Sequence, residues 1–209
     1  MQIMTTLKNL IGKARPSPGP AVPCQHDEIT ILVHGGSWYS GSPSDMAAYV
    51  PFMPGDVVNV KYTLLPKTTV AGQIGEIASV IKAAKQTHRR VYIVGYSAGA
   101  HLAVLAARRE SVTALVGVSS PINLAAVSGL EGVSRIARHL DPYREAAHDA
   151  THTLLLHGDD DPLCKLRGVQ AYAAKAKDVR LEHLAGIGHN SALILLFQDI
   201  IDVFLKEAP

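Results

Sequence analysis

Short apolar runs rich in β-branched residues alternate with helix-like segments along most of the chain. Each run has the length of a buried strand. Between the runs, apolar residues recur at the three- and four-residue spacing of an amphipathic helix. This alternation predicts a mostly parallel sheet of about six strands with helices on both faces. We expect strands over residues 29–33, 57–60, 90–96, 112–118, 152–156 and 179–184, and helices over 43–50, 74–84, 98–107, 162–177 and 191–205.

The 209 residues are enough for one domain rather than two. Residues 1–28 are poorly patterned and are expected to form an N-terminal extension, so the catalytic domain would span residues 29–209. Residues 119–150 interrupt the alternation and are too long for a bare loop. Their apolar residues at helical spacing predict either a peripheral helix packed on the sheet or a small cap over the substrate: Leu130, Val133, Ile136, Ala137 and Leu140.

Composition excludes several classes of partner. The formal net charge of +2 is too close to neutral to predict binding to nucleic acid or to an anionic membrane surface. Cys24 and Cys164 are the only cysteines, which is too few for a disulfide framework or for a zinc spacing. The sequence has no signal-peptide pattern and no apolar run long enough to cross a membrane. We therefore expect a cytoplasmic protein; the oligomeric state leaves no mark in the sequence.

The segment Gly95–Gly99 (GYSAG) follows a predicted strand and opens a predicted helix. A serine hydroxyl becomes a useful nucleophile when a base removes its proton and the backbone presents it to the substrate. A sharp strand-to-helix turn presents the side chain in this way, and glycines on both sides avoid Cβ clashes. The context favours Ser97 as a nucleophile over an ordinary glycine turn.

A second glycine-containing segment, His34–Trp38 (HGGSW), ends the first predicted strand. Glycines there allow backbone N–H groups to approach a developing oxyanion. The N–H groups of Gly36 and Ser37, together with that of Ala98, the residue after the serine, are predicted to form the oxyanion hole. Alternatively, the two glycines only make a turn at the end of a strand.

An acid and a base follow the last two predicted strands. His157–Asp161 (HGDDD) comes after residues 152–156, and Gly186–His189 comes after residues 179–184. Side chains at the carboxyl ends of parallel strands meet at one edge of the sheet. The order serine, aspartate, histidine along the chain is the order that α/β-hydrolases use. Three adjacent aspartates also permit a metal site, but no further ligand pattern supports one, so we predict no metal.

With these motifs, the sequence resembles the H-G-G-loop branch of α/β-hydrolase esterases and lipases, akin to hormone-sensitive lipase. It is most similar to the subgroup with kynurenine formamidase and the small feruloyl or acetyl-xylan esterase-like proteins. The resemblance rests on His34–Trp38, on Gly95–Ala103 and on Val60–Pro66, and it covers residues 29–206. It implies the α/β-hydrolase fold and identifies Asp161, the third residue after the glycine of its loop, as the catalytic acid.

The chain departs from this branch at three places. Tyr96 stands where kynurenine formamidases commonly have histidine, and Ser37 replaces the third glycine of the lipase loop. The segment before residue 29 is too short for the leading antiparallel strands of the family, so we expect a fold with trimmed N-terminal strands.

These observations predict a serine carboxylesterase that acts on small esters through an acyl-enzyme and needs no cofactor. Ser97 would attack, His189 would act as base and then as acid, and Asp161 would orient His189. The aromatic residues Trp38, Tyr62 and Tyr96 are candidates for substrate contact. The alternatives are an arylformamidase or other amide hydrolase with the same machinery, and a non-catalytic binding protein on the same fold.

Overall fold

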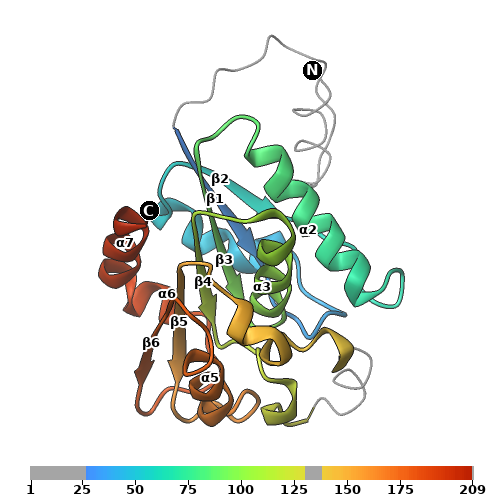
Figure 1. The fold of residues 1–209 in the computed structure, drawn as a ribbon, viewed down its shortest axis with the longest axis vertical. Helices are drawn as coiled ribbons and strands as arrows, with labels where there is room; N and C mark the ends of the chain where they lie inside the picture. Colours follow the sequence, from blue (N-terminus) through green and yellow to red (C-terminus); the bar gives the residue numbers. More distant parts are fainter. Residues whose placement is uncertain (1–26, 130–137, 209) are drawn as a thin grey trace.

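Six parallel strands form the central sheet, as the alternating pattern predicts. The computed structural model describes residues 27–129 and 138–208. The strands run in the order β2-β1-β3-β4-β5-β6 across the sheet (Figure 1). Their bounds are β1 Glu28–Val33, β2 Asp56–Val60, β3 Arg90–Tyr96, β4 Ala114–Val118, β5 Thr153–Gly158 and β6 Val179–Leu184. The predicted fold class is therefore confirmed.

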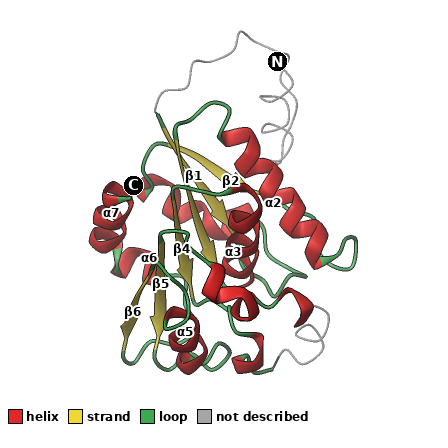
Figure 2. Cartoon of the chain, in the orientation of Figure 1, coloured by secondary structure: helices red, strands yellow, loops and turns green. Residues whose placement is uncertain are grey.

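Helices cover both faces of the sheet (Figure 2). Successive side chains of a strand point to opposite faces, so Ile31 and Ile93 pack in one apolar core while Leu32 and Val94 pack in the other. The first core includes residues of α2 (Val70–Ala84), α3 (Ala98–Glu110) and α5 (Leu166–Ala173). The second includes residues of the 3-10 helix η1 (Pro43–Phe52), α6 (Leu193–Leu196) and α7 (Gln198–Glu207).

Two predicted helices differ from the observed ones. The helix expected over 162–177 spans only Leu166–Ala173. It begins late because the backbone N–H groups of Leu163 and Cys164 donate to the Asp161 carboxylate instead of starting a helix. The helix expected over 191–205 is divided into α6 and α7 at Phe197, whose φ of −110° and ψ of 22° leave the helical region.

The segment 119–150 contains three 3-10 turns within its described part: η2 (Leu124–Ala126), η3 (Arg138–Leu140) and η4 (Pro142–His148). Of the residues that predicted a helix or cap here, Leu140 lies in η3, and Leu130, Val133, Ile136 and Ala137 lie outside the described residues. Most of the expected N-terminal extension also lies outside them, and Glu28 already belongs to β1.

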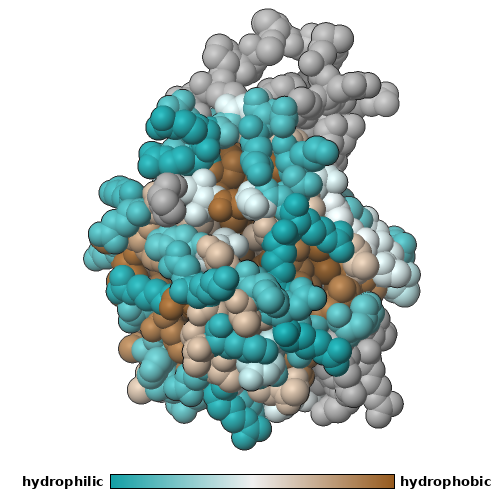
Figure 3. Space-filling model, viewed as in Figure 1, coloured by the Kyte–Doolittle hydropathy of each residue, from teal (hydrophilic) through white to brown (hydrophobic). Residues whose placement is uncertain are grey.

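Apolar side chains gather on the surface over β6 and the two C-terminal helices (Figure 3). The exposed residues of this region are Leu184, Leu195, Leu196 and Val203. β6 is the outermost strand on this side of the sheet, and all six of its residues are exposed or half-buried. None of the helices in the described part of the chain is both long enough and apolar enough to cross a membrane.

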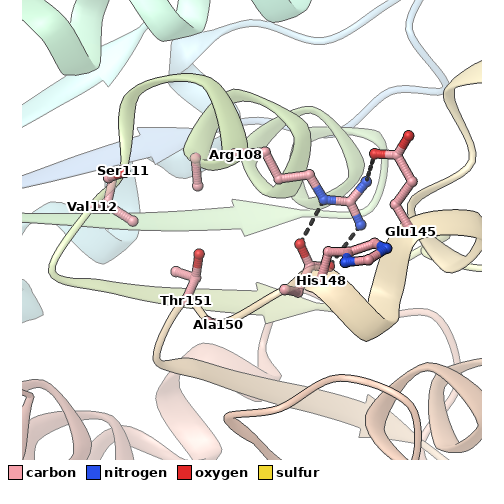
Figure 4. A pocket seen from close by; sticks show the side chains of 9 residues that line it. Arg108, Ser111, Val112, Glu145, His148, Ala150 and Thr151 are labelled. Carbon is pink, nitrogen blue, oxygen red and sulfur yellow. Dashed lines mark hydrogen bonds and ion pairs between the residues drawn. The ribbon is translucent and has the colours of Figure 1, made fainter.

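An ion pair fastens α3 to the segment before β5 (Figure 4). The Arg108 guanidinium donates to both carboxylate oxygens of Asp149 at 2.6 Å and to the carbonyl of Pro142 at 2.6 Å. The Tyr172 hydroxyl donates to the same carboxylate at 2.5 Å. A recess of about 450 Å³ lies beside this pair, but its walls include the residues just before β4 and β5. It therefore opens at the amino ends of the strands, away from the edge where ligands of such sheets bind.

Candidate active site

Ser97 occupies a sharp turn between β3 and α3. Its φ of 51° and ψ of −123° belong to neither strand nor helix and hold the side chain out from the carboxyl end of the sheet. The flanking residues must be glycines because there is no room for a Cβ atom at either position. A Cβ on Gly95 would lie 2.6 Å from the Cα of Ala100, and a Cβ on Gly99 would lie 2.2 Å from the carbonyl oxygen of Val33.

A hydrogen-bonded chain joins Ser97 to the predicted base and acid. The Ser97 Oγ lies 2.9 Å from His189 Nε2, and His189 Nδ1 lies 2.7 Å from Asp161 Oδ2. The three side chains come from the loops after β3, β5 and β6, which end at the same edge of the sheet. A Cβ on Gly158 would meet the Ile187 carbonyl at 2.2 Å, so glycine allows the acid and histidine loops to touch.

Asp161 is held as a carboxylate. Burial alone would raise its pKa, but hydrogen bonds from His189 and from the amides of Cys164 and Leu163 outweigh burial and lower the pKa below its usual value. An ionised Asp161 accepts a hydrogen bond from the N–H at Nδ1 of His189, which leaves Nε2 unprotonated and able to take the proton of Ser97.

The two neighbouring aspartates have other surroundings. The Asp159 carboxylate lies 2.6 Å from Nδ1 of His183 on the surface, and Asp160 is exposed. Below the loop, His157 is fully buried and its Nε2 donates to the Cys164 carbonyl at 2.7 Å. His157 thus fixes the loop that presents Asp161, a role that its position next to the glycine does not reveal.

The predicted oxyanion loop has an unusual backbone. Gly36, Ser37 and Trp38 have successive φ values of 110°, 51° and 68°. The carbonyl of Gly36 accepts from the N–H groups of the third and fourth residues after it, which closes a tight turn. A Cβ on Gly35 would lie 3.1 Å from the Cβ of Ser97, so this turn passes directly beside the nucleophile. Within the described part of the chain, no acceptor is bound by the N–H groups of Gly36, Ser37 and Ala98.

Tyr62, predicted as a substrate contact, lies behind this loop. It is 3% exposed, its ring stacks on that of His34 at 4.3 Å, and its hydroxyl donates to the His34 carbonyl at 2.9 Å. It does not line the hollow at Ser97. Its contacts instead support the start of the oxyanion loop.

The hollow in front of Ser97 is small, about 10 Å³, which is the room that one water molecule needs. Its walls are Ser37, Trp38, Ala98, Pro121, Leu163, Cys164 and His189. Trp38, one of the predicted contacts, is therefore placed at the site. The sequence does not predict Pro121, Leu163 and Cys164 as walls of the hollow, because no sequence pattern shows which loop residues face Ser97.

Tyr96 and Cys164 stand beside the triad as uncharged groups. The Tyr96 ring lies 5.4 Å from that of His189, and its hydroxyl donates to the His189 carbonyl at 3.4 Å. Burial, with smaller contributions from Asp161 and other neighbours, raises the pKa of Tyr96 to about 12. Burial also raises the pKa of the Cys164 thiol. Cys164 is thus a protonated wall of the hollow and does not compete with Ser97 as a nucleophile.

Asp161, Cys164 and His189 also offer oxygen, sulfur and nitrogen atoms within 4.8 Å of one another. Such atoms are the ligands that zinc takes in proteins. Here, however, the carboxylate and the imidazole are hydrogen-bonded directly to each other. The arrangement is that of a triad.

Comparison with known families decides where the chain belongs. Residues 20–135, more than half of the chain, match the BD-FAE family, and the match includes both the oxyanion loop and Ser97. The chain belongs to the BD-FAE family. Asp161 and His189 lie beyond the matched residues, so the family match alone does not reach the whole triad.

Solved structures similar to this BD-FAE protein include esterases. The thermophilic esterase Est2 of the Planctomycetes species Thermogutta terrifontis, with propionate bound, has a TM-score of 0.71 at 19% identity over 91% of this chain and 86% of that one. The same esterase phosphonylated by sarin has a TM-score of 0.74 at 18% identity, over 92% and 88%. A truncated carbohydrate esterase from gut microbiota has a TM-score of 0.68 at 15% identity, over 90% and 88%. At these identities the similarity establishes a shared α/β-hydrolase fold.

Proposed function

We propose that this BD-FAE protein is a serine esterase that hydrolyses small carboxylic esters through an acyl-enzyme. The observation that carries the proposal is the hydrogen-bonded chain from Ser97 to His189 to Asp161, with oxygen–nitrogen separations of 2.9 and 2.7 Å. These separations suit proton transfer from the hydroxyl to the imidazole as the new bond forms. The esterases that share the fold support the same chemistry.

The reaction has two halves. Ser97 Oγ attacks the ester carbonyl carbon while His189 Nε2 takes its proton, and the carbonyl oxygen becomes an oxyanion. The N–H groups of Gly36, Ser37 and Ala98 would stabilise that oxyanion. Collapse breaks the bond to the alcohol oxygen, which receives the proton from His189. Water then attacks the acyl-enzyme while His189 takes a proton from it. The bond to Ser97 Oγ breaks, the acid leaves, and His189 returns the proton to Oγ.

Short acyl groups fit this site best. The hollow at Ser97 has room for about one water molecule, and it is bounded by the rigid side chains of Trp38 and Pro121. A long chain would gain roughly 0.8 kcal/mol for each buried CH₂ only where an apolar groove receives it. The Thermogutta esterase, which shares the fold, binds propionate in one of its structures, and this supports a short acyl group here.

A panel of p-nitrophenyl esters tests the proposal. We expect kcat/KM to be highest for acetate or butyrate and to fall for octanoate and palmitate. Ser97→Ala should lower kcat by about 10⁴-fold or more and should abolish labelling by a fluorophosphonate. An optimum at octanoate or beyond would contradict the short-acyl assignment. Labelling that persists in Ser97→Ala would contradict the nucleophile.

N-formylkynurenine, assayed beside the esters, distinguishes an esterase from the main alternative, an arylformamidase. An amide has a poorer leaving group that must receive a proton from His189, so a site without special contacts to a formamide should favour esters. If N-formylkynurenine is turned over faster than every ester, the protein is an arylformamidase using the same triad. A folded protein that neither turns over these substrates nor reacts with the fluorophosphonate would be a binding protein.

A further inference from the structure

Among the described residues, the indole of Trp38 has one hydrogen-bond partner, and that partner lies on α3, the helix that follows Ser97. Trp38 Nε1 donates to Nδ1 of His101 at 3.3 Å, and the two rings meet edge to face with centroids 5.3 Å apart. His101 is one helical turn after Ser97 on α3, and its backbone N–H donates to the Ser97 carbonyl at 3.2 Å. Trp38 therefore connects the oxyanion loop to the first turn of α3.

The second nitrogen of His101 reaches a different segment. Nε2 donates to the carbonyl of Leu140, in η3, at 3.0 Å. Because Nδ1 accepts and Nε2 donates, the ring must be the neutral tautomer with its proton on Nε2. Burial, with a smaller contribution from nearby Arg108, lowers the pKa of His101 to about 4 against the opposing effect of the Leu140 carbonyl. The ring is fully buried and does not line the hollow at Ser97.

The backbone that this contact holds is strained. Ser37 and Trp38 are not glycines, yet both have φ values in the left-handed region, at 51° and 68°. Such residues keep this conformation only when surrounding contacts fix them. The Trp38 carbonyl accepts from Gln73 Nε2 at 2.9 Å and from the Leu65 N–H at 3.0 Å. Within residues 27–129 and 138–208, the side chain is fixed by a hydrogen bond to His101 alone.

We propose that His101 is a positioning residue for the oxyanion loop. By holding the indole of Trp38, it sets the backbone of residues 36–38 relative to Ser97, and it links that loop to the segment ending at Leu140. The proposal rests on the esterase function proposed above. Its consequence is that the N–H groups of the loop are aimed at the transition state by a histidine that never contacts the ester.

Two substitutions of His101 distinguish a positioning role from a role in packing alone. His101→Leu removes both hydrogen bonds, whereas His101→Gln retains one acceptor for Trp38 and one donor for Leu140. Because a displaced oxyanion loop weakens transition-state binding, His101→Leu should lower kcat by about 10- to 100-fold with little change in KM. His101→Gln should recover a large part of that loss.

A second buried histidine serves as a control, because removing any buried histidine could lower kcat by disturbing the fold. His88 is buried and hydrogen-bonded to Asp56 at 3.0 Å, but it lies before β3 at the opposite edge of the sheet. His88→Leu should therefore keep the wild-type kcat. If kcat falls equally in the two Leu variants, or if folded His101→Leu keeps the wild-type kcat, the positioning role is wrong.

A spectroscopic measurement tests the contact without turnover. Trp38 is the only tryptophan of the chain, so all indole fluorescence reports on this hydrogen bond. In a Ser97→Ala background at neutral pH, His101→Leu should move the emission maximum to shorter wavelength, and His101→Gln should return it toward that of the parent. Unchanged emission in all three proteins would overturn the contact itself. Inactivity of the wild type toward every ester would instead overturn the proposed function, with the emission shift intact.

Discussion

Asp161→Asn isolates the contribution of one carboxylate oxygen to the triad. Asp161 uses Oδ1 to accept the amides of Leu163 and Cys164, both at 2.8 Å, and Oδ2 to accept from His189 Nδ1 at 2.7 Å. An asparagine of the same shape keeps the first two bonds when its oxygen takes the place of Oδ1. Its NH₂ group then faces His189, where it can only donate.

The consequence is the wrong tautomer of the base. Nδ1 of His189 must now accept, so the ring proton moves to Nε2, and Nε2 can no longer take the proton of Ser97. Loss of the base in this way lowers kcat by about 10⁴-fold in a serine triad. This corresponds to about 5.4 kcal/mol of transition-state stabilisation. KM should change little, because residue 161 is 2% exposed and does not line the hollow at Ser97.

The neighbouring aspartates supply matched controls. Asp159→Asn alters a surface pair with His183, and Asp160→Asn alters an exposed side chain. Each should keep kcat within a few-fold of the wild type in p-nitrophenyl acetate hydrolysis, with far-UV circular dichroism reporting the fold. The reasoning is refuted if one of these controls is the crippled variant, or if folded Asp161→Asn retains more than about a tenth of wild-type kcat.

Two further predictions concern stability. The pKa of His101 is about 4 when folded and 6.5 when unfolded, so the unfolded chain binds an extra proton as pH falls below 6.5. Between pH 7 and pH 5 the wild type should therefore lose about 2 kcal/mol of unfolding free energy, as measured by urea titration. His101→Gln should not show this loss. Equal losses in the two proteins would show that His101 does not titrate in this way. Arg108→Ala leaves the buried Asp149 carboxylate without its cation and should cost about 3 kcal/mol or more, whereas Arg180→Ala, in an exposed pair, should cost less than about 1 kcal/mol. Similar urea midpoints for Arg108→Ala and Arg180→Ala would contradict the value expected for Arg108→Ala.

The sequence contained enough information to predict the sheet and the convergence of Ser97, Asp161 and His189. Each strand is a local apolar run, and a parallel sheet places the carboxyl ends of its strands at one edge without any further information. Ser97, Asp161 and His189 stand within a few residues of such ends, so the fold brings them together. The choice among three adjacent aspartates rested on resemblance. The structure gives a physical reason for that choice, since Asp161 alone is buried against His189.

Other features depend on contacts that no local pattern records. Trp38 and His101 are 63 residues apart, and only the packing of the loop on α3 brings their rings together. Cys164 reaches the hollow because the chain wraps around Asp161 instead of starting a helix. The break at Phe197 likewise has no proline or glycine to announce it. In each case tertiary packing overrides the local preference of the sequence.

The position of the three proposed catalytic residues along the chain also bears on how activity is acquired during folding. Ser97 is 92 residues from His189, and two strands of the sheet, β4 and β5, lie between β3 and β6. From β3 to β6 the strands pair side by side in chain order, so Ser97 and His189 meet only when β4, β5 and β6 have all been added to β3. A chain still lacking β6 on the ribosome has a nucleophile but no base. Onset of ester hydrolysis during refolding should therefore require the pairing of β6, which makes turnover a reporter of that step.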